Sequence, residues 1–277
     1  MKDSPFEQNA RVRHDFIAGS KRVKLFGRLN YNLFNVKRPL LPCRMEIEMF
    51  KNSPEFCLIR SKGVTDEYKV VIHSCKLNVD RVVYRKDFLS EMKKLMSDGC
   101  VTKFPYTKTE SHTFDIPKGT RIWRSIDLLM PIPRPKRAYL VICEADSVYG
   151  NNWENNPMVF PAARHHVNYV QFYHTNTPLL EKAYEPDFKN MNCNKKYAAL
   201  LKVATNAFKT GVVPGITPDD FVGMYSIFAI DTDLEHGDIN IEIKFDQETS
   251  QALRGILFTQ RDACFTMDKS GNVSHYR

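Results

Sequence analysis

Apolar and polar residues alternate along several stretches of the chain. Within residues 239–245, Ile239, Ile241, Ile243 and Phe245 share one face, and the polar residues between them share the other. A period of two is typical of a strand that buries one of its faces, so this stretch predicts a strand. Other alternating or apolar-rich stretches predict strands at residues 23–29, 43–50, 56–59, 68–84, 103–116, 137–143, 166–173, 225–230 and 255–259.

Helical spacing occurs in two places, and a third stretch has the residues of a helix start or a turn. In residues 87–97 the apolar positions recur at intervals of three and four, and Gly99 follows as a natural end. We expect this stripe to face the core; it consists of Phe88, Leu89, Met92, Leu95 and Met96. A second helix is predicted at residues 195–209. Residues 217–220 carry the signature of a helix start or a turn; in a helix, Thr217 would be the cap and Pro218 the first residue.

Strands outnumber helices, and they do not alternate with helices as they would in a parallel α/β sheet. This pattern favours an all-β fold, a two-sheet β-sandwich with short helices in the long loops. Residues 1–20 are expected to form a loose basic tail. No linker divides the rest, so residues 21–277 are predicted to be a single domain.

Composition limits the environment of the protein. The chain has 277 residues, and no apolar run approaches the roughly 20 residues needed to span a bilayer. The polar N-terminus has no apolar core of a secretory signal, so we expect no membrane contact and no secretion. Its seven cysteines include no Cys-x-x-Cys pair and are expected to be reduced thiols in a cytosolic or nuclear environment.

Positive charge is concentrated near the N-terminus. The net charge is +8, and residues 1–38 contain nine Lys or Arg against three Asp or Glu. Such a segment can contact nucleic-acid phosphates, although its basic residues do not form a tight run. A solvated basic face explains the same pattern, and both interpretations stay open.

Catalytic, cofactor-binding and metal-binding residues are not predicted anywhere in the sequence. His165 and His166 are the nearest approach to a metal site, but neighbouring residues on a strand point to opposite faces. The His-x-His pair of a cupin-type metal site is missing, as are the GxSxG and GxxxxGK[ST] motifs. Asp231 and Asp233 fit a solvated turn better than a cation site. We therefore expect no cofactor and no enzymatic activity.

Two further features are expected to serve packing or contact. Trp123 and Trp153 are most simply packing or interface aromatics. Residues 149–157 form a long, polar, turn-rich loop, which is the best candidate for a surface contact element.

A series of short motifs follows in one order from about residue 20 to the end. They are VKLFGRLN at 23–30, LFN at 33–35, PLL at 39–41, FCL at 56–58, GCVTKFPYT at 99–107, FDIPKG at 114–119, PKR at 135–137, NNP at 155–157 with Phe160, NYVQFY at 168–173, YSIFAID at 225–231 and NV at 272–273. Together they resemble the major capsid (hexon) proteins of adintoviruses and related Polinton-like viruses.

This resemblance implies a jelly-roll β-sandwich of the viral-capsid type. Capsid proteins of that family carry two jelly rolls side by side, and three copies form a pseudo-hexagonal capsomer. The matching motifs correspond to the second roll with its insertions, and the first roll has no counterpart here. The resemblance therefore implies a truncated or split copy, such as one from an integrated element, located in the virion and in the cytoplasm or nucleus of the host cell.

The sequence leaves two main hypotheses for function. The first is a structural capsid subunit, or an endogenised remnant of one, that acts by self-association and by contact with other capsid proteins. The second is a host-retained binding module for a protein or nucleic-acid partner, with the basic N-terminus contributing. An enzyme on a jelly-roll scaffold is a third, weaker hypothesis, because fold does not dictate function.

Overall fold

A computed structural model describes most of the chain. The described residues are 12–27, 29, 34, 40, 45–60, 63–80, 82–99, 101–125, 135–148, 156–174, 176–208, 215–232, 239–268 and 272–276. The chain divides into two compact units, residues 1–35 and 36–277. In the first unit, residues 12–17 are helical and are followed by a turn. The strands that the structure describes all lie in the second unit.

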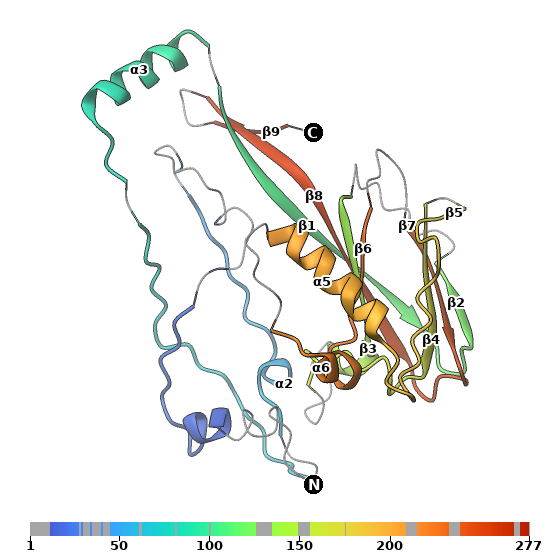
Figure 1. Ribbon diagram of the computed structural model, residues 1–277. Helices are drawn as coiled ribbons and strands as arrows, with labels where there is room; N and C mark the ends of the chain where they lie inside the picture. The colour runs from blue at the N-terminus through green and yellow to red at the C-terminus, as the bar shows by residue number, and fades with distance from the viewer. Residues whose placement is uncertain are drawn as a thin grey trace. The chain divides into compact units, whose positions relative to one another are not determined.

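The described strands of the second unit form two antiparallel sheets (Figure 1). The first has the order β1-β8-β3-β6, with β9 also paired to β8; its strands are β1 (Thr102–Ile116), β8 (Leu253–Met267), β3 (Arg137–Glu144), β6 (Phe228–Asp231) and β9 (Val273–Tyr276). The second has the order β2-β7-β4-β5, from β2 (Ile122–Arg124), β7 (Ile239–Phe245), β4 (Val167–His174) and β5 (Thr177–Pro178).

The strand order defines the topology. β1 pairs with β8, β2 with β7, β3 with β6 and β4 with β5, and every pair is antiparallel. The first eight strands thus form one long hairpin, which is rolled so that β1, β3, β6 and β8 lie in one sheet and the other four in the second. This is the arrangement of a jelly roll, a double-sheet fold of eight strands. The predicted all-β jelly-roll sandwich with short helices is confirmed.

The main core lies between the two sheets. Ile239, Ile241 and Ile243 of β7 are almost fully buried against apolar residues of β3, among them Leu140 and Ile142. The alternation predicted for residues 239–245 is therefore correct for the apolar face. Burial of such side chains is the dominant favourable contribution to folding.

One cross-strand pair depends on a glycine. Phe114 of β1 lies opposite Gly255 of β8, and a Cβ placed on Gly255 would come 2.1 Å from carbons of the Phe114 ring. The Phe114 ring also stacks on Trp123, with 4.1 Å between ring centroids. The Trp123 side chain also donates a hydrogen bond from Nε1 to the Asp115 carbonyl oxygen, so its predicted packing role is confirmed.

Helices cover the outer face of the first sheet. Ala229 of β6 and Tyr139 of β3 face away from the main core and pack with Leu200, Val203 and Phe221. These three residues belong to α5 (Asn194–Phe208), which matches the predicted helix, and to α6 (Pro218–Gly223), where the sequence left a helix start or a turn open. Thr217 caps α6 as predicted: its hydroxyl oxygen accepts a hydrogen bond from the Asp220 N–H, and the Asp220 carboxylate accepts one from the Thr217 N–H.

Several predicted strands are wrong. The described residues of 23–29, 43–50 and 68–84 have no strand pairing, and residues 56 and 57 lie in the short helix α2 (Pro54–Cys57). The alternation in these stretches is real, but a strand needs a neighbour that completes its backbone hydrogen bonds. The other described strands do not supply one.

The remaining differences concern single elements. Helix α3 (Lys86–Ser97) forms as predicted, yet its stripe does not face a core, because Phe88 and Leu95 are about half exposed. The strand predicted at 225–230 begins only at Phe228. The strand predicted at 255–259 is the much longer β8, and the sequence did not indicate β2, β5, β9 or the short helix α4 (Ala145–Val148).

Candidate functional site

Two small cavities lie in the second unit, and neither is large enough for an ordinary ligand. The larger holds about 160 Å³ and lies between the start of α5 and α6, where Met191, Cys193, Tyr197 and Phe221 line it. The smaller holds about 10 Å³, enough for one water molecule. Pockets for small molecules are usually about 300–1,000 Å³.

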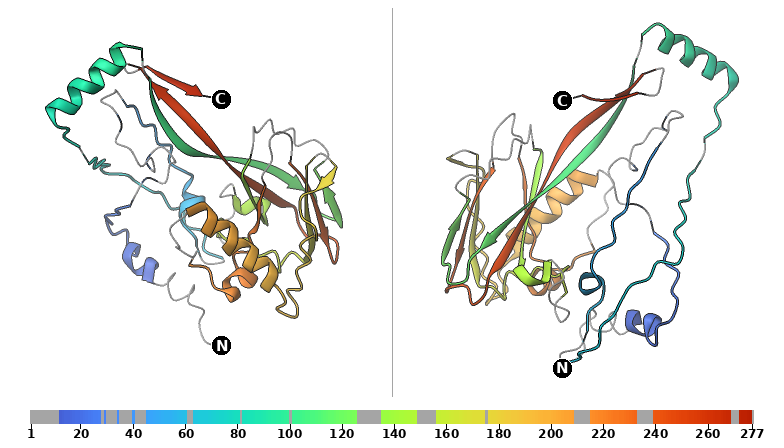
Figure 2. Two further views of the ribbon diagram at one scale, coloured as in Figure 1. Left: turned by 45° about the horizontal axis from the view of Figure 1, so that its top comes forward. Right: turned by 180° about the vertical axis from the view of Figure 1, so that it is seen from behind.

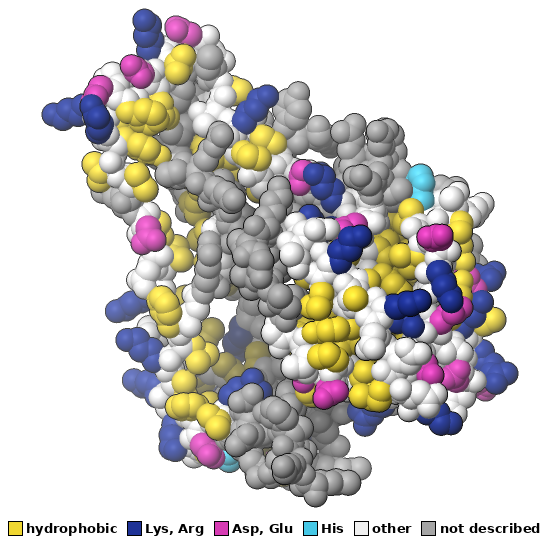
Figure 3. Space-filling view, viewed as in Figure 1, with side chains coloured by type: hydrophobic (Ala, Val, Ile, Leu, Met, Phe, Trp, Pro, Cys, Tyr) yellow, Lys and Arg dark blue, Asp and Glu magenta, His cyan; other side chains and the backbone are white. Residues whose placement is uncertain are grey.

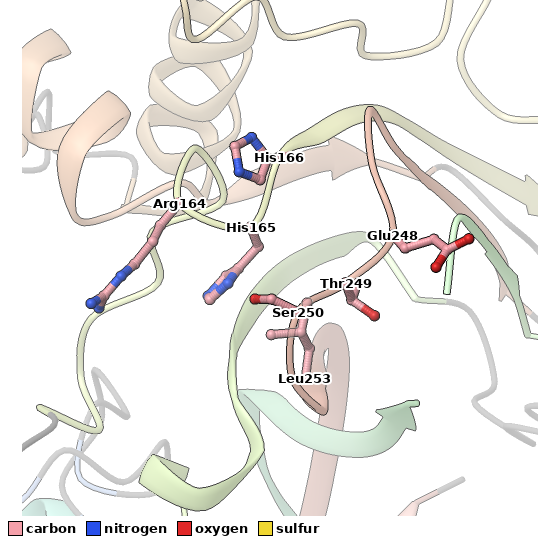
Figure 4. A pocket seen from close by; sticks show the side chains of 7 residues that line it. All are labelled: Arg164, His165, His166, Glu248, Thr249, Ser250 and Leu253. Carbon is pink, nitrogen blue, oxygen red and sulfur yellow. The ribbon is translucent and has the colours of Figure 1, made fainter. Parts of the chain in front are cut away.

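The smaller cavity contains the two histidines singled out in the sequence (Figure 4). Both lie in the turn before β4, which begins at Val167, and their rings point in different directions. His165 is buried, and burial lowers the pKa of its imidazole to about 4, so the ring is neutral at pH 7. His166 is exposed, with a φ of 58°. The pair therefore does not converge on a common ion.

The described residues contain no cluster of three or more His, Cys, Asp or Glu side chains that could hold a metal ion. Asp231 instead lies at the end of β6 and serves structure. Its carboxylate accepts a hydrogen bond from Asn206 Nδ2 at 2.9 Å and lies 3.5 Å from Arg137 Nε, which links α5 to the sheet. Asp231 is thus paired, whereas the sequence predicted a solvated turn. Asp233 lies outside the described residues.

A polar network on the outer face of the second sheet was not predicted. Glu242 of β7 is buried, and its carboxylate accepts hydrogen bonds from Arg124 at 2.8 Å and from the Tyr173 hydroxyl at 2.9 Å. These partners and the nearby Lys244 lower the pKa of the Glu242 carboxyl against the opposing effect of burial. Lys244 also lies over the Tyr169 ring, 4.1 Å from its centroid. The mutual pairing of these groups is what stabilises a buried carboxylate.

Most of the large exposed apolar side chains lie between residues 45 and 95 of the second unit. Those more than half exposed are Met49, Phe50, Ile59, Val71, Ile72, Leu77, Val79, Val82, Val83 and Leu95. Figure 3 shows apolar side chains along α3 in particular. We call these residues the exposed apolar segment. Exposed apolar surface on this scale usually marks a protein or membrane contact, so this segment is the candidate functional surface.

The contact features predicted from sequence are only partly described. Of the loop at 149–157, only Asn156 and Pro157 are described, and the Asn156 side chain accepts a hydrogen bond from the Met158 N–H at 2.9 Å. Trp153 lies outside the described residues. The described basic residues near the N-terminus are exposed, and among them Lys21 donates a hydrogen bond to the Asp15 carbonyl oxygen.

Comparison with known proteins gives structural similarity only. No family model matches the chain, and no curated protein matches it. Among solved structures, it is similar to VP54 of the virus PBCV-1, fitted into a reconstruction of the virophage Sputnik, with 8% identity and a TM-score of 0.40. It is also similar to the mavirus major capsid protein and to a PBCV-1 capsid chain, each with 6% identity and a TM-score of 0.35.

These similarities extend over 64% of this chain. The chain in turn covers 52%, 41% and 52% of the three solved chains, which is about half of their length. Among the described residues, none belongs to a helix long and apolar enough to cross a membrane.

Proposed function

We propose that this protein is a structural subunit of a viral capsid and that it acts by self-association without catalysis. The observation that carries the proposal is the exposed apolar segment. Residues such as Phe50 and Val83 are 87% exposed in the single chain, and their burial against another chain would be favourable by about 1.5–3 kcal/mol each.

Two further observations support this proposal. The jelly-roll strand order is one that viral capsid domains use, alongside lectins and cupins. The ordered sequence motifs resemble capsid proteins of adintoviruses and Polinton-like viruses, and the finer assignment to that group, with location in the virion, is part of the proposal. An origin as an endogenised copy is likewise part of the proposal.

The oligomeric state of the purified full chain tests the proposal. Light scattering coupled to size-exclusion chromatography, at several protein and salt concentrations, should show oligomers that grow with concentration. Electron microscopy should then show assemblies of regular size. A protein that is monomeric under every condition would contradict the proposed function.

The basic N-terminus favours a second candidate, a binding module for nucleic acid. If Lys and Arg contact phosphates, affinity for a duplex should fall steeply as salt rises and fall again when residues 1–24 are removed. Equal affinity of the full and shortened chains, measured by fluorescence anisotropy, would exclude this role for the segment.

A further inference from the structure

Helix α3 has an apolar face that is not buried in the single chain. The residues on this face lie three and four positions apart and are Phe88, Leu89, Met92 and Leu95. Phe88 and Leu95 are 46% and 56% exposed, and neither of the two described core clusters contains a residue of α3. Figure 2 shows α3 as one continuous helix from two sides. We call this face the α3 stripe.

A helix as short as α3 depends on a packed neighbour. It has 12 residues, and isolated helices shorter than about 12–15 residues are only marginally stable in water. In proteins most of the stability of a helix comes from packing of its apolar face. No described helix or strand makes more than marginal contact with α3, although Tyr84 stacks on Phe88 with 5.2 Å between ring centroids. The α3 stripe therefore lacks most of the packing that stabilises such a helix.

The two flanks of the α3 stripe carry opposite charges. Each residue of an α-helix is turned by about 100° from the one before it, so Glu91 borders the stripe on one side and Lys93 on the other. Asp87 lies one turn before Glu91, and Lys86 lies two turns before Lys93. Asp87 already pairs with Arg85, 2.7 Å away, and Glu91 is the acidic group nearest to the stripe. Glu91 and Lys93 are both exposed.

We propose that α3 of one copy packs against α3 of a second copy, parallel and in register, around a rotation axis that runs along the helices. This inference rests on the proposed self-association and specifies one of its contacts. Parallel packing places the acidic flank of each helix beside the basic flank of the other, as the charged e and g positions lie in parallel coiled coils. Antiparallel packing would bring Glu91 to Glu91 and Lys93 to Lys93, and like charges oppose that arrangement.

The spacing of the apolar residues agrees with this orientation. Phe88, Met92 and Leu95 are separated by four and three residues, which is the spacing of successive d, a and d positions in a heptad. In register, each of these residues lies beside its own copy. Glu91 then lies only about 3 Å along the axis from Lys93 of the second copy. A shift by one turn would remove one of the three apolar layers from the contact.

The α3 contact determines orientation more than affinity. A contact of three layers is smaller than a standard interface, which buries about 800 Å² on each partner, and exposed ion pairs add little to affinity. The oligomer therefore also needs other residues of the exposed apolar segment, such as Phe50 and Val83. A change confined to α3 should weaken the oligomer without abolishing it.

Charge reversal in the full chain tests the orientation. Glu91→Lys turns both ion pairs of a parallel contact into like-charge pairs, so the apparent dissociation constant at low ionic strength should rise about tenfold in light scattering over a dilution series. Adding Lys93→Glu exchanges the two flanks and should restore the parent value. Lys94→Glu, on the far face of α3, is the matched control and should leave the dissociation constant unchanged.

A disulfide between two copies tests the register. In Phe88→Cys, parallel packing in register places the two introduced thiols side by side, whereas antiparallel packing places residue 88 near the other end of the second helix. The full chain is oxidised mildly at a concentration at which it is oligomeric. Trypsin then releases residue 88 in the peptide 87–93, which contains no native cysteine, and mass spectrometry should find two such peptides joined. Ser90→Cys, in the same peptide but on the far face of α3, should not cross-link.

The outcomes separate this inference from the proposed function. Oligomers of Glu91→Lys with the parent dissociation constant would overturn the parallel contact, while self-association stands. Oligomeric Phe88→Cys that yields no joined peptides would also overturn it, because the α3 stripe would then contact a different segment of the chain. A parent protein that stays monomeric at every concentration would overturn both.

Discussion

Gly255 occupies a position that no other residue can fill without displacing Phe114. A Cβ at residue 255 would lie 2.1 Å from Phe114 ring carbons, and the same ring stacks on Trp123, so any shift of Phe114 also disturbs that stack. We predict that Gly255→Ala lowers the free energy of unfolding by about 1–3 kcal/mol, the usual cost of overpacking a core. Urea denaturation measures this change. Gly223→Ala is the control, because a Cβ there meets no atom within 4 Å, and equal losses in both variants would refute the explanation.

Buried His165 makes stability depend on pH. Its pKa is about 4 in the folded chain, against about 6.5 for an unfolded histidine, so the unfolded state binds the proton more tightly. The contribution of neutral His165 to the free energy of unfolding is complete above pH 6.5, and it is lost as the pH falls from 6.5 toward 4. The predicted loss at pH 5 is about 2 kcal/mol.

Unfolding measurements at pH 7 and pH 5 on His165→Gln isolate this effect. Between pH 7 and pH 5, the free energy of unfolding should fall less in the variant than in the parent, because the glutamine side chain does not titrate. Exposed His166 is the matched control: His166→Asn, which keeps a residue tolerant of the positive φ, should show the same pH dependence as the parent.

Helix α6 shows how local sequence determines an element. The Thr217 and Asp220 side chains cap its first turn, and Phe221 then packs fully buried against α5 and β6. We predict that Thr217→Ala reduces the free energy of unfolding by about 1 kcal/mol. Thr217→Ser keeps the hydroxyl and should stay close to the parent in thermal unfolding; an equal loss in both would show that the methyl group matters, not the cap.

The strands show where local pattern is insufficient. Residues 239–245 and 68–84 both carry strand-like apolar content, yet only the first forms a strand in the single chain. The difference is a neighbour: β7 lies between β2 and β4, whereas no described strand lies beside 68–80. Alternation indicates which face a strand would bury, but the hydrogen-bonded partner comes from residues distant in sequence.

At the scale of the molecule, self-association should depend on the exposed apolar segment. We predict that Phe50→Ser combined with Val83→Ser shifts the protein toward monomer in light scattering. Its unfolding midpoint should change little, because both side chains are 87% exposed in the single chain. Lys118→Ser, an exposed change in the turn after β1, is the control and should leave the oligomers intact. Unchanged oligomers in the double variant would contradict this role.

The candidate surface could be predicted only in part. The apolar residues of α3 and of residues 68–84 were visible in the sequence, but their periodicity looked like that of core-facing elements. Only their exposure in the structure distinguishes a surface from a core. The Glu242 network escaped prediction because its members come from β2, β4 and β7, and no local spacing connects Arg124 or Tyr173 with Glu242.

The sequence by itself determined the all-β class, the helices at 86–97 and 194–208, the capped start of α6 and the inward face of β7. Each of these depends on residues close together in the chain, where side-chain spacing and capping decide the outcome. The tertiary structure decided the rolled pairing of the eight strands, the length of β1 and β8, and which alternating stretches remain without a partner. These features depend on contacts between distant residues, and the pattern of a single stretch does not encode its partner.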